Sequence, residues 1–197
     1  MIRTLCFLLV AVISSAAFAQ TPTRVRGTVQ KLDGNVLTVK TRGGDTVNIR
    51  MADNFGVMGL AKASVNDVTT NKYIGTTTVG ERNGALVADE IHIFTEQMRG
   101  TAEGHYDWDL RPDSKMTNAN VASISSMGKD RVMTVQYKGG EKKILVPDHT
   151  VVVAFQPAER SELKRGAKIF VIAQKQPDGS LAAPRVNVGL KGQIPPM

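Results

Sequence analysis

Apolar and polar residues alternate along much of this chain, with turn residues at short intervals. Alternation over residues 24–32 is followed by a turn at Asp33–Asn35 and a return over Val36–Lys40. A second turn at Gly43–Gly44 precedes another alternating run, Thr46–Ile49. A period of two residues around such turns is typical of β-hairpins. Residues 24–49 are therefore predicted to form a three-stranded meander.

The same pattern occurs twice in the sequence. Residues 24–49 match residues 120–145 at a constant offset of 96, and the match resumes at an offset of 95 from Val68, which aligns with Leu163. In each copy the meander is followed by a predicted helical turn and then by two strands. The helical turns are expected at Ser64–Asp67 and Ser161–Lys164, where a capping serine precedes an acidic residue.

Three strands, a helical turn and two strands is the element order of the five-stranded Greek-key barrel of the oligonucleotide- and oligosaccharide-binding (OB) type. We therefore expect an all-β protein with one short helical turn per repeat, arranged as two tandem OB-like barrels. The expected division is a signal peptide at 1–19, a first barrel at 20–97, a charged connector at 98–119, a second barrel at 120–191 and a tail at 192–197.

The N-terminus predicts export. Arg3 precedes an apolar run, Leu5–Ile13, and then Ala17-Phe18-Ala19, which is the order of a secretory signal cleaved after Ala19. The only cysteine, Cys6, lies within that run, so the mature chain would have no disulfide. No later apolar run is long enough for a spanning helix. We expect a soluble periplasmic protein.

Several of these segments resemble a known family. Arg24–Val29, Asn35–Val39 and Leu163–Lys168 are similar to exported bacterial proteins built from a barrel-like domain of unknown function. The connector around Trp108–Pro112 resembles that of a two-domain subgroup. Relatives there are sometimes named metal transporter permeases, which a chain without spanning helices cannot be. The resemblance implies the barrel fold and, at most, a metal-related context.

The connector holds the densest group of polar residues. If it is extended, one face presents a histidine and three carboxylates, a ligand mix that suits zinc, nickel, copper or manganese. These residues are Glu103, His105, Asp107 and Asp109. The alternative is that these carboxylates pair with basic neighbours such as Arg111. A divalent metal is thus the one cofactor that the sequence suggests, while Trp108 and Arg111 are expected to anchor the connector or to contact a partner.

Positive charge is concentrated in the second copy. Residues 120–197 hold 12 basic and 6 acidic residues. This excess predicts contact with an anionic surface or an envelope partner. The candidate residues are Lys142, Lys143, Lys164, Arg165 and Lys168, which could equally form a solvated face. Few aromatic residues accompany them, and this scarcity, together with export, argues against nucleic-acid binding.

The remaining polar residues do not predict an enzyme. His92 follows Ile91 and precedes Ile93, and alternation places it on the opposite, surface side of the last strand of the first copy. His149 lies in a loop with no second histidine nearby. Ser161 and Lys164 match a Ser-x-x-Lys spacing, but they fall in the predicted helical turn, where capping explains the serine better. We therefore expect a non-enzymatic binding protein, with a metal-binding accessory protein as the alternative.

Overall fold

The chain folds into strands joined by short turns. The computed structural model describes residues 22–128 and 130–197, and this part contains twelve strands and four 3-10 turns. The predicted signal and its cleavage site lie outside it. The strands are β1 Thr23–Asp33, β2 Val36–Thr41, β3 Thr46–Ala63, β4 Tyr73–Arg82, β5 Ala85–Ile93, β6 Gly104–Asp107, β7 Lys115–Met127, β8 Asp130–Tyr137, β9 Gly140–Val146, β10 Val151–Pro157, β11 Lys168–Lys175 and β12 Leu181–Gly189. The turns are η1 Val65–Asp67, η2 Glu96–Met98, η3 Arg160–Glu162 and η4 Leu190–Gly192.

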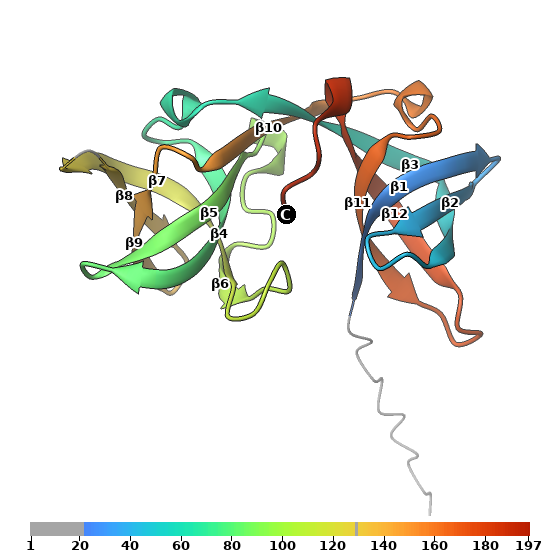
Figure 1. Cartoon of the computed structure of the whole chain (residues 1–197), viewed down its shortest axis with the longest axis horizontal. Coiled ribbons are helices and arrows are strands. Elements are labelled where there is room, and N and C mark those ends of the chain that lie inside the picture. Colours follow the sequence, from blue (N-terminus) through green and yellow to red (C-terminus); the bar gives the residue numbers. More distant parts are fainter. Residues whose placement is uncertain (1–21, 129) are drawn as a thin grey trace, which may run out of the picture.

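The strands form two lobes joined along one side (Figure 1). Lobe 1 consists of β1, β2, β3, β12 and β11, which close into a five-stranded mixed barrel because β12 pairs with both β11 and β3. Lobe 2 follows the order β5-β4-β7-β8-β9, with β6 beside β7 and β10 beside β5. Two residue pairs, Leu86 with Ile144 and Val87 with Leu145, join β5 to β9. The all-β prediction is confirmed with one closed barrel; a second closed barrel is not shown.

The closed barrel takes its strands from both copies of the repeat. Its meander, β1-β2-β3, comes from the first copy, whereas its hairpin, β11-β12, comes from the second. Lobe 2 reverses this exchange and combines β4-β5 of the first copy with β7-β8-β9 of the second. The expected division placed residues 20–97 in one barrel and 120–191 in another. The observed pairing departs from that division.

The exchange follows from the course of β3. This strand does not end after Ile49 but continues to Ala63, and its last six residues pair antiparallel with β10. In this pair Leu60 lies opposite Phe155, its own counterpart in the repeat at an offset of 95. The two copies therefore meet about an approximate two-fold axis. In each copy, the segment between the meander and the hairpin carries the chain into the other lobe.

Apolar residues form a separate core in each lobe and a third cluster between them. The core of lobe 1 includes Leu37 and Ile49 with Val171 and Val186. Lobe 2 buries a comparable set around Ile91. The cluster between the lobes is rich in aromatic residues and methionines and contains Leu60, Tyr73, Phe94, Met116, Val153, Phe155, Phe170 and Met197. Burial of this third cluster holds the two lobes together.

The predicted helical turns are single 3-10 turns. Asp67 accepts hydrogen bonds from the Ser64 main-chain N–H (2.7 Å) and hydroxyl (2.9 Å), so Ser64 stands at the start of η1 as expected. These hydrogen bonds lower the pKa of Asp67. In the second copy Glu159 occupies the position before η3, and Ser161 lies inside the turn. The prediction that Ser161 caps this turn is wrong.

The connector and the tail belong to the folded body. β7 begins at Lys115, within the expected connector, and β6 pairs with it over Gly104–Asp107. The C-terminal residues return between the two lobes (Figure 1), where Met197 is buried. No helix in residues 22–128 and 130–197 has the length and apolar character that crossing a membrane requires.

Candidate functional site

A cavity of about 340 Å³ lies between the two lobes. We call it the interlobe cavity. Its wall is mostly apolar, with a few polar side chains on each side. The lining residues are Pro22, His92, Phe94, Met98, Thr101, Ala102, Tyr106, Trp108, Met116, Asn118, Phe155, Ile172, Gln174, Pro184, Arg185, Asn187 and Met197. A concave apolar site with a few converging polar groups is where small molecules usually bind.

A buried polar chain supports one wall of the cavity. Glu90 on β5 is only 2% exposed. Its Oε1 accepts hydrogen bonds from the Thr77 hydroxyl (2.5 Å) and the Thr77 main-chain N–H (3.2 Å). Its Oε2 lies 3.2 Å from Nδ1 of His92. This contact fixes the orientation of the imidazole.

The prediction that His92 lies on the surface is wrong. Its side chain points away from Ile91 and Ile93, as alternation requires, but it is only 4% exposed. The ring stands edge-on to Phe94 and Phe155, with centroid distances of 4.9 and 5.7 Å. Alternation identifies the side of a strand, whereas the second lobe determines what covers that side. No local signal in the sequence distinguishes the two outcomes.

Gly75 leaves room for two polar side chains of the wall. A Cβ atom at this position would lie 1.9 Å from Nε2 of His92 and 2.5 Å from Oδ1 of Asn118. The Asn118 Nδ2 group donates to the main-chain oxygen of Thr101 (3.1 Å) and to the Tyr106 hydroxyl (3.2 Å). Oδ1 of Asn118 is buried and has no hydrogen-bond partner among the described residues.

Aromatic rings form the rest of the wall. Phe94 and Phe155 stack in parallel at 5.2 Å, and the Trp108 ring packs against Phe170 of β11 at 6.2 Å. The Arg24 guanidinium lies 4.1 Å above the Trp108 ring, a cation–π contact. Nε1 of Trp108 is buried and, within the described residues, has no acceptor. Trp108 therefore joins the connector to lobe 1 and also lines the cavity.

The four predicted metal ligands each have a different partner. Asp109 pairs with Arg26 (2.7 Å) and Arg24 (3.7 Å) of β1, and Asp107 pairs with Lys115. Glu103 accepts a hydrogen bond from the Lys138 main-chain N–H (2.9 Å), and His105 Nδ1 lies 2.8 Å from the Thr117 hydroxyl. Among residues 22–128 and 130–197, no three His, Cys, Asp or Glu side chains form a group that could hold a metal ion.

The other predicted contact residues lie apart. Arg111 forms an ion pair with Asp89 of β5 (2.7 Å), which ties the connector to lobe 2. Of the predicted polyanion residues, Lys142 and Lys143 lie on β9 in lobe 2, whereas Lys164 and Arg165 precede β11 and Lys168 begins it, in lobe 1. These five basic residues therefore do not form one surface, because the exchange places the meander and the hairpin of the second copy in different lobes.

The environment of His105 predicts its titration. Burial, and then the charges of Lys142 and Lys115, lower the pKa of this imidazole below its usual value of 6.5. When the pKa of a histidine is lower in the folded state than in the unfolded state, the unfolded state binds the proton first. The free energy of unfolding therefore decreases as the pH falls below the unfolded-state pKa. Proton NMR should show one histidine, absent from His105→Gln, that titrates below pH 6.5. Titration at or above 6.5 would contradict this environment.

A scan of protein-family models, a search of curated proteins and a search of solved structures each found no match to this chain. The family resemblance of the repeat and the connector therefore stays a prediction.

Proposed function

We propose that this is a non-enzymatic binding protein of the periplasm that holds one small, mostly apolar molecule in the interlobe cavity. One observation carries the proposal. The cavity between the lobes is concave and mostly apolar, and polar side chains such as those of Asn118, Gln174 and Asn187 are among its lining residues. Its volume of about 340 Å³ lies near the lower end of the range for small-molecule sites, roughly 300–1,000 Å³. The periplasmic location rests on the predicted signal.

The lining residues indicate the chemistry of the ligand. The aromatic rings and methionines suit an aromatic or aliphatic body, and the side-chain amides of Gln174 and Asn187 supply hydrogen-bond donors and acceptors. We therefore infer a molecule with an aromatic or aliphatic body and a few polar groups.

Binding, rather than catalysis, suits the polar groups of the wall. Glu90 is occupied by Thr77 and His92, and His92 is held between Phe94 and Phe155. These contacts keep the wall rigid, and a preformed site loses less entropy when a ligand binds. On this proposal, Glu90 and His92 position the wall and do not act on the ligand.

We further propose that both lobes are barrels of the OB type. In lobe 1 the third and fifth strands along the chain are β3 and β12. They run parallel, and Val186 of β12 pairs with Val57 of β3. At the repeat offset of 95 the same register recurs in lobe 2, where Ile91 of β5 pairs with Val152 of β10. In this interpretation β9 and β10 together take the place of the single strand β3. The interlobe cavity then lies on the two-fold axis, lined by His92 and by its counterpart Asn187.

Tryptophan fluorescence tests the binding proposal directly, because Trp108 is the only tryptophan of the chain and lines the cavity. We expect small aromatic amides and phenols, titrated one at a time, to include compounds that change its emission saturably and raise the melting temperature. Ligand binding at 100 times Kd stabilises the folded state by about 2.7 kcal/mol.

Two variants locate the binding site. Ile172 lines the cavity and is 46% exposed, whereas Val36 on β2 is 40% exposed and does not line it. Ile172→Phe should weaken binding by narrowing the cavity, and the matched Val36→Phe should leave it unchanged. Equal effects of the two variants, or no saturable response to any compound, would overturn the proposal.

A further inference from the structure

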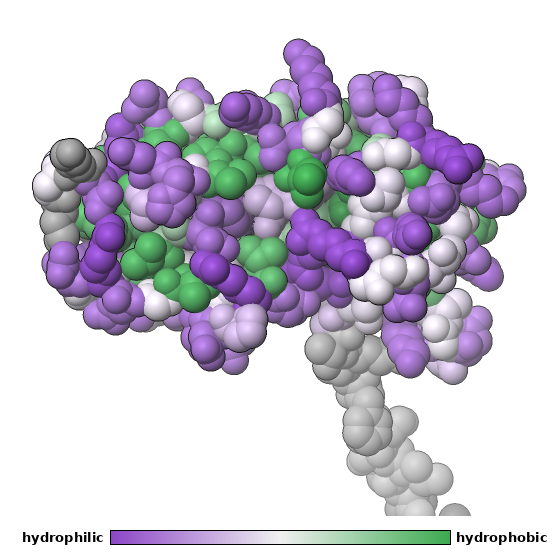
Figure 2. Space-filling view, in the orientation of Figure 1, coloured by the Kyte–Doolittle hydropathy of each residue, from purple (hydrophilic) through white to green (hydrophobic). Residues whose placement is uncertain are grey.

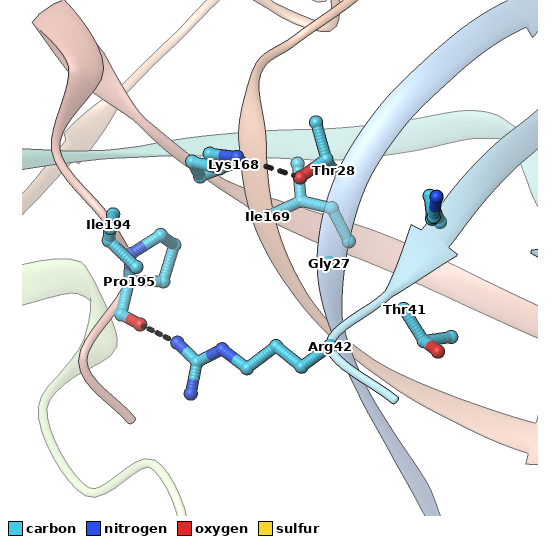
Figure 3. A pocket seen from close by; sticks show the side chains of 9 residues that line it. Gly27, Thr28, Thr41, Arg42, Lys168, Ile169, Ile194 and Pro195 are labelled. Carbon is cyan, nitrogen blue, oxygen red and sulfur yellow. Dashed lines mark hydrogen bonds between the residues drawn. The ribbon is translucent and has the colours of Figure 1, made fainter. Parts of the chain in front are cut away.

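A second, smaller cavity lies on lobe 1 and is lined by three cationic side chains. It has a volume of about 200 Å³ and lies where β1, the end of β2, the start of β11 and the C-terminal segment meet. Figure 3 shows its lining residues, with Arg42 reaching toward the C-terminal segment and Lys168 toward Thr28. The cations are Lys40, Arg42 and Lys168. We call this the basic pocket.

Among the described residues, the three cations have no acidic partner. Arg42 donates through Nη2 to the main-chain oxygen of Pro195 (3.0 Å), and Lys168 donates to the Thr28 hydroxyl (2.9 Å), so both acceptors are neutral. Lys40 has no side-chain hydrogen bond or ion pair within the described residues. Within this part of the chain, none of the three pairs with a carboxylate.

Several other cations of the fold do have an acidic partner. Arg82, Arg99, Arg111 and Lys115 each form an ion pair with an aspartate or glutamate. Near the basic pocket, the carboxylate of Asp109 is already shared by Arg24 and Arg26. Burial of Arg42, and then the charge of Arg26, lower the pKa of the Arg42 guanidinium. An anion bound beside Arg42 would relieve this repulsion.

Gly27 and two isoleucines complete the lining of the pocket. The close approach of β2 requires glycine at position 27, because a Cβ there would lie 2.3 Å from the main-chain oxygen of Lys40. Ile169 and Ile194 form the apolar sides. A guanidinium with two lysines around a small concavity suits a compact oxyanion, because arginine binds phosphate through parallel hydrogen bonds and lysine acts as a point charge.

We propose that the basic pocket binds a phosphate group. This inference is independent of the interlobe cavity. The phosphate could belong to a soluble molecule or to a lipid headgroup, and both sources present the same chemistry to Lys40, Arg42 and Lys168. Of the five residues that the sequence suggested for anion contact, Lys168 alone lies in this pocket, with Lys40 and Arg42 contributed by the first copy.

Calorimetry on the whole chain with inorganic phosphate tests the site. We expect saturable binding that sodium chloride at the same ionic strength does not reproduce. Arg42→Gln and Lys40→Gln should each raise Kd about tenfold or more, since a charge-assisted hydrogen bond contributes about 1.5–3 kcal/mol. Lys143→Gln, which removes an exposed charge on β9, is the matched control and should leave Kd unchanged. Lys40→Gln breaks no side-chain hydrogen bond among the described residues, so it still tests the site if Arg42→Gln is unstable.

Vesicle sedimentation separates the two sources. Binding to phosphatidylglycerol vesicles that Arg42→Gln and Lys40→Gln abolish, with no binding of inorganic phosphate, identifies a lipid headgroup. Binding of inorganic phosphate without vesicle binding identifies a soluble phosphate. Equal losses in Lys143→Gln and the pocket variants, or no response to either probe, would overturn the proposal.

Discussion

Gly75→Ala is expected to lower the free energy of unfolding by about 3 kcal/mol, because the new methyl group has no space. Its Cβ would lie 1.9 Å from Nε2 of His92 and 2.5 Å from Oδ1 of Asn118, far inside contact distance. Overpacking of this kind costs about 1–3 kcal/mol or more. Urea unfolding followed by circular dichroism measures the loss.

The matched control is Gly56→Ala on β3. A Cβ at this position meets only Cγ of Arg185, at 3.7 Å, which is an ordinary contact. We expect a change within about 1 kcal/mol, in the stabilising direction, because alanine restricts the unfolded chain. In a His92→Ala background, Gly75→Ala should cost less, since one of the clashing groups is gone. Similar losses for Gly75→Ala and Gly56→Ala would show that His92 does not occupy the place described above.

A disulfide between positions 50 and 182 is expected to form within one molecule and to demonstrate the exchange of hairpins. Arg50 of β3 and Ala182 of β12 are partners in the parallel pairing that closes lobe 1. Neighbouring strands lie about 4.8 Å apart, within the Cα separation that a disulfide spans. In Arg50→Cys/Ala182→Cys, made in a chain without Cys6, oxidation should consume both thiols and accelerate migration on a non-reducing gel.

The alternative pairing supplies the control. If each copy closed its own barrel, Val87, the repeat counterpart of Ala182, would lie beside Arg50. Val87 instead pairs with Leu145 in lobe 2, so Arg50→Cys/Val87→Cys should keep two free thiols. A disulfide in this second variant and none in the first would refute the exchange. Cross-linked dimers of the first variant would show that the hairpins exchange between molecules.

Much of the strand pattern could be predicted from local signals. Turns such as that at Gly34, where φ is +56°, require a conformation that glycine adopts readily, and alternation around them fixes which residues face a core. Leu37 and Ile49 are fully buried on this basis. Ser64 at the start of η1 was equally evident, because the spacing to its acidic partner is local.

The candidate sites were much less predictable. The sequence suggested a metal site in the connector because its acidic residues lie close together along the chain. In the fold, however, Asp107 and Asp109 pair with different cations on different strands. The interlobe cavity combines His92 with residues far along the chain, and the basic pocket combines Arg42 with Lys168. Figure 2 shows apolar patches interrupted by polar side chains over one face, and no local sequence pattern anticipates this distribution.

Two properties of this protein were therefore readable from the sequence alone: a duplicated strand unit and the inward faces of its strands. The duplication follows from comparing two segments of the chain, and the inward faces depend on periodicity and turn chemistry over a few residues. Which hairpin closes which meander depended on long-range packing, because the two copies carry the same alternation and either pairing satisfies it. The continuation of β3 to Ala63 and its pairing with β10 settled that choice, and with it the position of every side chain that lines the space between the lobes.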